Sequence, residues 1–189
     1  MRKSLVIMVV MAAMAAPAAA ADSGFYLGAG FGLSSFDVGD FYDDYAPLNF
    51  EEGNPGFTVF GGYRIIKYLA VEVSYLDYGK VTMHEGLRGF NEALSVSIDQ
   101  WGGSVLGVIP LSKKVGIFAK VGVASWNTSV YYTAGDDTLD LSDSGTDLTY
   151  GLGVDFIIKK IGIRVASDWL DVPDTSGVFM VSFNLTYNF

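Results

Sequence analysis

The 189-residue chain has no cysteine and a formal net charge of −9, from 21 acidic and 12 basic residues. This excess of acid argues against nucleic acid or another polyanion as the main partner. Half of the residues are hydrophobic and 23 are glycine, a composition that fits many strands joined by tight turns better than it fits helices. Without cysteine no disulfide is available, so stability must come from the fold itself.

Residues 1–21 have the pattern of a secretory signal peptide. Arg2 and Lys3 supply the positive start, residues 5–14 form an apolar stretch, and residues 19–21 are alanines. The apolar stretch is too short to span a bilayer as a helix, so we expect cleavage before Asp22. The remaining chain, residues 22–189, contains no long uninterrupted apolar run and predicts one exported domain without a transmembrane helix.

The last twelve residues, 178–189, alternate strictly between apolar and polar side chains. One face carries Phe179, Val181, Phe183, Leu185, Tyr187 and Phe189, and the other carries Met180, Ser182, Asn184, Thr186 and Asn188. A period of two indicates a strand with different surroundings on its two faces. In a soluble sheet the apolar face would be the core, whereas in a membrane barrel it would meet lipid and the polar face would line the lumen.

Seven further strand-like segments precede this one, at residues 24–35, 56–65, 68–78, 93–109, 115–131, 147–157 and 161–170. Gly102 and Gly103 are expected to mark a bulge, because the polar parity shifts across them. The connections at residues 66–67, 110–114 and 158–160 are hairpin-length, whereas 37–55, 79–92 and 133–146 are longer and 172–177 is short. Alternating short and long connections are typical of an outer-membrane barrel, whose short turns and both termini lie in the periplasm.

Six charged residues fall on the strand faces opposite the apolar side chains: Arg64, Glu72, Lys120, Asp155, Arg164 and Asp168. Facing lipid near the midplane, each basic residue would cost about 2–4 kcal/mol. Facing inward, the three cations and three anions can neutralise one another. An eight-stranded barrel is just wide enough to be filled by side chains. We therefore predict an all-β, up-and-down antiparallel transmembrane barrel of eight strands with a plugged lumen, rather than a soluble barrel with an apolar cavity.

Three stretches of the sequence carry a family resemblance. Residues 60–79, FGGYRIIKYLAVEVSYLDYG, resemble the hairpin of strands two and three in OmpA-like transmembrane domains. Residues 105–122, VLGVIPLSKKVGIFAKVG, and 150–156, YGLGVDF, resemble later parts of the same domain. The resemblance covers the whole mature chain and implies an eight-stranded OmpA-like barrel in the outer membrane of a Gram-negative bacterium.

The resemblance also implies roles for single residues. Glu72, Lys120 and Arg164 stand where the family places lumen charges on strands three, five and seven. The terminal Phe189 resembles the signal that the outer-membrane assembly machinery reads. Barrels of this family are often followed by a periplasmic peptidoglycan-binding domain, which we expect to be absent here.

Two classes of function follow as expectations. The first is a structural and surface-interaction protein, active in envelope integrity or adhesion, with outer-membrane lipid and lipopolysaccharide as its surroundings and a monomeric state. The second is a narrow channel or a conduit for small solutes or hydrophobic molecules. A lipid-modifying enzyme is a third class, but it rests on the single histidine, His84, and on Ser95 and Ser97 by proximity in sequence alone, so we expect no catalysis.

No cofactor is expected. The acidic segment that holds Asp136, Asp137, Asp140 and Asp143 is a weak candidate for Ca²⁺ or Mg²⁺, because hard cations take carboxylate oxygens. Its spacing departs from the EF-hand pattern, and we therefore interpret it as a solvated acidic loop.

Aromatic residues near the predicted strand ends indicate a girdle at the two membrane interfaces. They are Trp101, Trp126, Trp169, Tyr63, Tyr68, Tyr75, Tyr78, Tyr131 and Tyr132.

Overall fold

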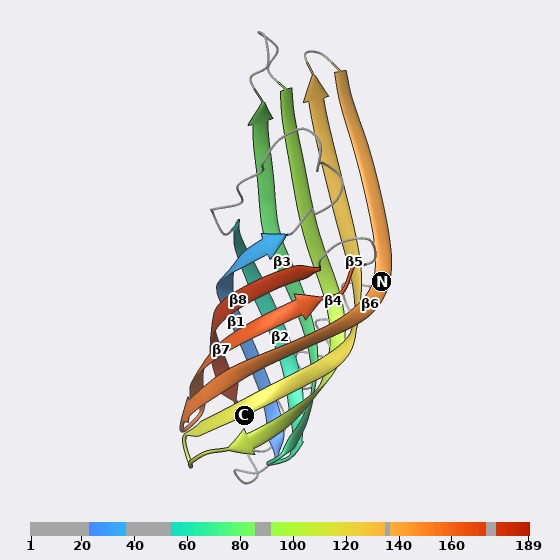
Figure 1. Ribbon diagram of the computed structural model, residues 1–189. Helices are drawn as coiled ribbons and strands as arrows, with labels where there is room; N and C mark the ends of the chain where they lie inside the picture. Colours follow the sequence, from blue (N-terminus) through green and yellow to red (C-terminus); the bar gives the residue numbers. More distant parts are fainter. Residues whose placement is uncertain (1–22, 37–53, 86–91, 135–136, 173–176) are drawn as a thin grey trace, which may run out of the picture.

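The structure, a computed structural model, describes residues 23–36, 54–85, 92–134, 137–172 and 177–189. Eight antiparallel strands close into one barrel in which each strand pairs with its sequence neighbours and the last pairs with the first (Figure 1). The strands are β1 (Gly24–Phe36), β2 (Asn54–Ile66), β3 (Leu69–Glu85), β4 (Glu92–Pro110), β5 (Val115–Ala134), β6 (Asp137–Ile158), β7 (Ile161–Leu170) and β8 (Val178–Asn188). The predicted fold class is confirmed.

Three hairpin-length connections lie at one end of the barrel, at residues 67–68, 111–114 and 159–160, as predicted to within two residues. We call this the short-turn end. No helical segment in the described part of the chain has the length and apolar character needed to cross a bilayer.

Two strands are longer than the sequence indicated. β6 begins at Asp137, not near residue 147, and its register with β5 runs unbroken from Val115↔Phe156 to Ala134↔Asp137. β3 likewise continues to Glu85. The prediction of a loop over residues 133–146 was wrong, because aspartate and serine disfavour strands only weakly and the strand-forming residues of β5 opposite them dominate.

The predicted bulge at Gly102 and Gly103 is also wrong, because both glycines occupy regular positions in the ladders with β3 and β5. In the β3–β4 ladder the register shift lies in β3, between Asp77 and Lys80. There Gly79 has φ +83° and donates its N–H to Asp77 Oδ1 at 2.7 Å. A left-handed backbone with a local carboxylate partner favours glycine at this position.

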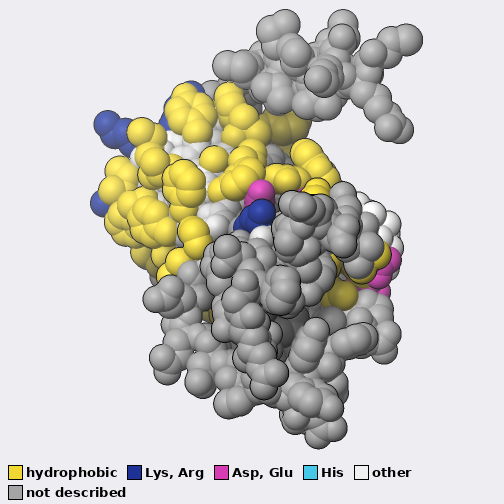
Figure 2. All heavy atoms as spheres, turned by 90° about the horizontal axis from the view of Figure 1, so that it is seen from above, with side chains coloured by type: hydrophobic (Ala, Val, Ile, Leu, Met, Phe, Trp, Pro, Cys, Tyr) yellow, Lys and Arg dark blue, Asp and Glu magenta, His cyan; other side chains and the backbone are white. Residues whose placement is uncertain are grey.

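Most of the large apolar side chains lie on the outside of the barrel. Phe31 is 79% exposed, and Val73 and Leu185 are each 60% exposed. Figure 2 shows hydrophobic side chains gathered over the visible part of the wall. An apolar exterior on this scale would be unfavourable in water, so the predicted assignment of faces, with lipid outside, agrees with the structure.

Glycines on the inner face make room for large aromatic rings on the neighbouring strand. Three such pairs stand directly opposite each other in the ladders: Gly62 with Tyr26, Gly28 with Phe60, and Gly153 with Phe118. A Cβ at these glycines would lie 2.2–2.3 Å from a ring carbon. Each ring therefore lies across glycine backbone, and the three rings belong to an inner apolar layer near the short-turn end.

A second inner layer lies toward the other end of the barrel and is also apolar. It comprises Leu76, Tyr78, Ala124, Trp126, Leu170, Val172, Val178 and Met180. The prediction that Tyr78 and Trp126 belong to the interfacial girdle was wrong, because both share the inward strand parity and are buried. Trp101, Tyr63, Tyr68 and Tyr131 do face outward, and Tyr75 packs on Trp101 with ring centroids 4.9 Å apart. The side chain of Tyr132 lies outside the described residues.

Replacing Gly28 by alanine is expected to lower the free energy of unfolding by about 1–3 kcal/mol, because the new methyl group overlaps the Phe60 ring. Gly107→Ala is the matched control, since no atom lies within 4 Å of a Cβ at Gly107 on the outer face. Urea unfolding in lipid vesicles, followed by tryptophan fluorescence, measures both. Equal stabilities of the two variants would contradict the proposed ring-on-glycine packing.

Candidate functional site

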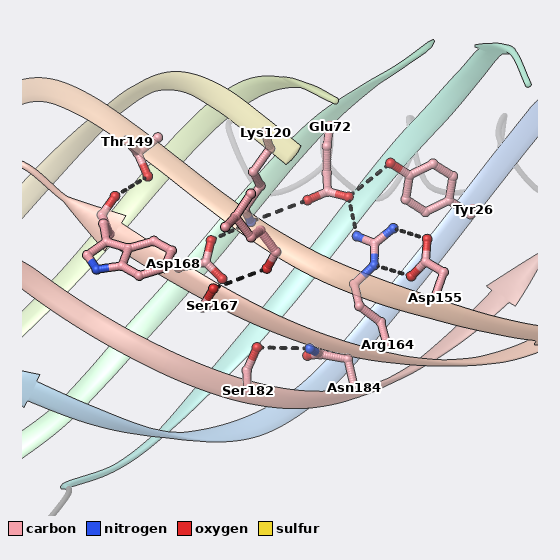
Figure 3. A network of polar contacts seen from close by, with 12 residues as sticks. Tyr26, Glu72, Lys120, Thr149, Asp155, Arg164, Ser167, Asp168, Ser182 and Asn184 are labelled. Atoms are coloured by element: carbon pink, nitrogen blue, oxygen red, sulfur yellow. Dashed lines mark hydrogen bonds and ion pairs between the residues drawn. The ribbon is translucent and has the colours of Figure 1, made fainter. Parts of the chain in front are cut away.

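Arg164 lies at the centre of the barrel interior and binds two carboxylates (Figure 3). It stands opposite Asp155 in the ladder of β6 and β7. Its Nε donates to Asp155 Oδ1 at 2.7 Å and its Nη2 to Oδ2 at 3.1 Å, while Nη1 donates to Glu72 Oε2 at 2.6 Å. The fork of the guanidinium thus holds Asp155 with two parallel bonds and reaches across the lumen to β3 with the third.

Glu72 connects this group to a second cation. Its Oε2 also accepts a hydrogen bond from the Tyr26 hydroxyl at 2.9 Å, and its Oε1 lies 3.8 Å from Lys120 Nζ. Lys120 in turn forms an ion pair with Asp168. Figure 3 shows the resulting chain of contacts, which runs from Asp168 through Lys120 and Glu72 to Arg164.

The network is removed from solvent, with one exception. The side chains of Glu72, Lys120, Asp155, Arg164 and Asp168 are 8% exposed or less. Arg64 is 21% exposed, and its Nη2 lies 3.9 Å from Asp155 Oδ2. Five of the six predicted lumen charges therefore form one buried network, and Arg64 lies at its edge toward the short-turn end.

Three aromatic rings surround the Arg164 guanidinium. Its Cζ lies 4.5 Å from the ring centroid of Phe118, 4.6 Å from that of Phe60 and 5.4 Å from that of Tyr26. Rings at these distances attract a cation that has lost its water. Sequence reasoning missed this cage. The sequence does contain inward-facing aromatic residues, each of which pairs with a glycine on the neighbouring strand. These pairs can be recognised only once the strand register is known.

The interior is closed by side chains on both sides of the network. Leu106 lies toward the short turns, and Leu76, Tyr78 and Met180 lie toward the other end, all 1% exposed or less. Gln100 and Asn184 are also fully buried, and Asn184 Nδ2 donates to Ser182 Oγ at 2.9 Å. The described side chains therefore fill the lumen, which agrees with the small diameter of an eight-stranded barrel.

The remaining predicted sites are away from this network. The Phe189 N–H donates to the Phe25 carbonyl at 3.0 Å, which ties the end of the chain to β1. Asp143 is exposed and accepts a hydrogen bond from the Ser144 N–H. Asp136 lies outside the described residues, as do the side chains of Asp137, Asp140 and His84. Within the part of the chain that is described, no three carboxylate or histidine side chains gather at a distance suited to a metal.

Arg164→Met is expected to lower the free energy of unfolding by about 3–5 kcal/mol, because it removes the cation that two buried carboxylates share and their remaining ion pairs are long. Arg64→Met is the control, with an expected loss under about 1 kcal/mol, since Arg64 is partly exposed and its ion pair is long. Chemical unfolding in vesicles measures both values. A loss as small for Arg164 as for Arg64 would show that the network does not stabilise the barrel.

Comparison with known proteins places this geometry in a family. The model of the outer membrane protein beta-barrel domain matches residues 4–189, and no curated protein sequence matches the chain. Among solved structures, Yersinia pestis Ail, the attachment invasion locus protein, has a TM-score of 0.59 at 14% identity, covering 90% of this chain and 100% of that one. Neisserial surface protein A has a TM-score of 0.56 at 14% identity, covering 89% and 100%.

The N-terminal barrel of Pseudomonas aeruginosa OprF has a TM-score of 0.51 at 12% identity, covering 87% of this chain and 97% of that one. At these identities the solved structures show a shared fold. With the family match over nearly the whole chain, they establish that this chain belongs to the outer-membrane β-barrel protein family.

Proposed function

We propose that the barrel is a membrane anchor for a sheet that projects from the cell surface, with the short turns and both termini in the periplasm. The ladder of β2 and β3 ends at Phe57↔Asp77, and that of β6 and β7 ends at Thr149↔Leu170. The ladders among β3, β4, β5 and β6 continue to Glu85↔Glu92 and Ala134↔Asp137. Four strands therefore extend beyond the barrel wall, as Figure 1 shows at the top of the view.

This extension is the observation that carries the proposal. β6 continues for residues 137–148 beyond the start of its ladder with β7, which is about 40 Å along the strand at about 3.3 Å per residue. Closing a barrel and crossing the membrane do not require that length. A sheet held away from the bilayer is instead suited to contact with a partner, because binding residues are generally held in position by a scaffold.

The charge of the projecting sheet limits the class of partner. β6 carries Asp137, Asp140, Asp143 and Asp147 along the projecting segment. One solved structure of Ail is a complex with the heparin analogue sucrose octasulfate. The names of Ail and of Neisserial surface protein A support a role at the cell surface, but an acidic sheet repels a sulfated polyanion. We therefore expect a cationic or neutral partner here, bound by a monomer.

Two roles from the resemblance complete this proposal. Phe189 is proposed as the residue that the outer-membrane assembly machinery reads, which its position at the end of β8 beside the outward-facing Tyr187 supports. Outer-membrane lipid surrounds the apolar wall, with lipopolysaccharide around the projecting sheet. No catalytic role is proposed.

Shortening the β5–β6 hairpin tests the proposal. Deleting residues 131–140 and joining the paired residues Val130 and Leu141 through a two-residue turn keeps the register. We expect the barrel to remain folded and cells to lose attachment to a polylysine-coated surface, with no attachment to heparin-coated surfaces in either case. Full attachment by the shortened protein would contradict a role for the projecting sheet.

A conduit is the second candidate, because the lumen carries full charges in place of a wholly apolar filling. The Glu72 carboxylate lies 2.6 Å from Arg164 and 3.8 Å from Lys120. If the Glu72 side chain moved from one cation to the other, the space inside the lumen would change. The apolar layer with Leu76 and Met180 still closes one side of the network.

In planar bilayers we expect no conductance steps from the unchanged protein and steps from the double variant Leu76→Ala, Met180→Ala, which opens the apolar layer to water. Val73→Ala on the outer face is the control. Regular steps from the unchanged protein would contradict the plugged lumen and favour the conduit.

A further inference from the structure

The short-turn end concentrates lysines. Lys67 lies in the turn between β2 and β3, Lys113 and Lys114 in that between β4 and β5, and Lys159 and Lys160 in that between β6 and β7. All five are exposed, and the three turns contain no acidic residue. The turns lie together at the bottom of the view in Figure 1. The chain as a whole is strongly acidic, so this end has the opposite charge to the rest of the molecule.

These lysines and Arg64 line one concave surface, a cavity of about 680 Å³ at the end of the barrel. Among the described residues that line it, Asp155 has the one side-chain carboxylate, and both of its oxygens are already bonded to Arg164. Six cationic side chains thus line the cavity, against one acidic side chain that is already bonded. Such a concave basic surface attracts and concentrates anions.

Arg64 forms the inner part of this surface and is incompletely paired. Its ion pair with Asp155 is 3.9 Å long, and its Nε is buried with no hydrogen-bond partner among the described residues. A guanidinium in this state has donor capacity for an oxyanion, which it recognises better than an ammonium group does because of its planar fork.

The turn between β6 and β7 holds lysine where the backbone favours another residue. Lys159 has φ +59°, the left-handed region that tight hairpin turns require and that glycine and asparagine adopt with less strain. Backbone preference therefore does not account for lysine at this position, whereas its charge beside Lys160 fits the basic surface.

Two of the lysines also lie at the level of the outer aromatic residues. Lys67 Nζ lies 4.7 Å from the Tyr68 ring centroid, and Lys160 Nζ lies 5.9 Å from that of Tyr187. Both tyrosines face outward from the barrel wall. Because exposed tyrosines on such a wall lie at the headgroup level, the rim of the basic surface adjoins the phosphates of the surrounding lipid.

We propose that the short-turn end is a binding site for phosphate-bearing anions, with Arg64 at its base and Lys113, Lys114 and Lys159 at its mouth. The phosphate comes either from the headgroup of an anionic phospholipid in the adjoining leaflet or from a soluble phosphorylated compound. Both sources present the same oxyanion chemistry to the same side chains, and the two arms of the experiment separate them.

The first arm uses inorganic pyrophosphate as the probe, titrated calorimetrically into the full chain in a non-ionic detergent at low salt. The triple variant Lys113→Gln, Lys114→Gln, Lys159→Asn is expected to bind at least about tenfold more weakly, because it removes three of the six cations. Asparagine suits the backbone at position 159. Lys80→Gln is the control, because Lys80 is an exposed lysine of β3 away from the short turns, and its affinity is expected to be unchanged.

The second arm repeats the titration in nanodiscs of phosphatidylcholine with and without phosphatidylglycerol. Weaker pyrophosphate binding in the presence of phosphatidylglycerol, seen in the unchanged protein and absent from the triple variant, supports the lipid headgroup as the ligand. Equal binding in both discs supports a soluble phosphorylated ligand. Absence of pyrophosphate binding in detergent would overturn the proposal. Equal weakening of that binding in the triple variant and in the Lys80 control would also overturn it. Circular dichroism of each variant shows that the barrel is folded.

Discussion

The contact of Arg164 with Asp155 and Glu72 is the interaction on which the interior depends. A hydrocarbon exterior leaves no favourable place for charge on the outer face of a strand near the midplane, so the ionised groups at that level must lie inside. Inside, each charge needs a partner, since an isolated buried ion is far more costly than a paired one. Arg164 meets this need by joining β6, β7 and β3 through three hydrogen bonds, and Lys120 extends the same neutralisation to Asp168.

Glycine makes this arrangement possible in so narrow a barrel. The rings that surround Arg164 lie over Gly28, Gly62 and Gly153 on neighbouring strands. Each ring occupies the space that a side chain at the glycine would otherwise fill. The result is a cation that has lost water, held by carboxylates along its edge and by aromatic rings within 5.4 Å. The glycines on the inner face are thus part of the ion-binding geometry as well as of the strands.

Strand parity alone predicted the barrel, its outward apolar face and the inward direction of the charges. It did not predict which charges meet, because Glu72 and Arg164 are 92 residues apart and their contact depends on the registers of all the strands between them. Tyr78 and Trp126 were misplaced because their positions near predicted strand ends were given more weight than their strand parity, which is inward for both. The length of β6 was underestimated because its polar outer half resembles a loop when it is considered without its partner β5.

The pairing of β1 with β8 has a consequence for how the molecule forms. This ladder joins Tyr26 to Asn188 and Phe36 to Val178, which are contacts between the two extremes of the folded chain. Such distant contacts form slowly, because a large loop must close first. Until β1 and β8 pair, the sheet has two edge strands whose unpaired N–H and C=O groups are free to pair with a strand of another chain. Completion of the cylinder is therefore the step most in need of a chaperone or template.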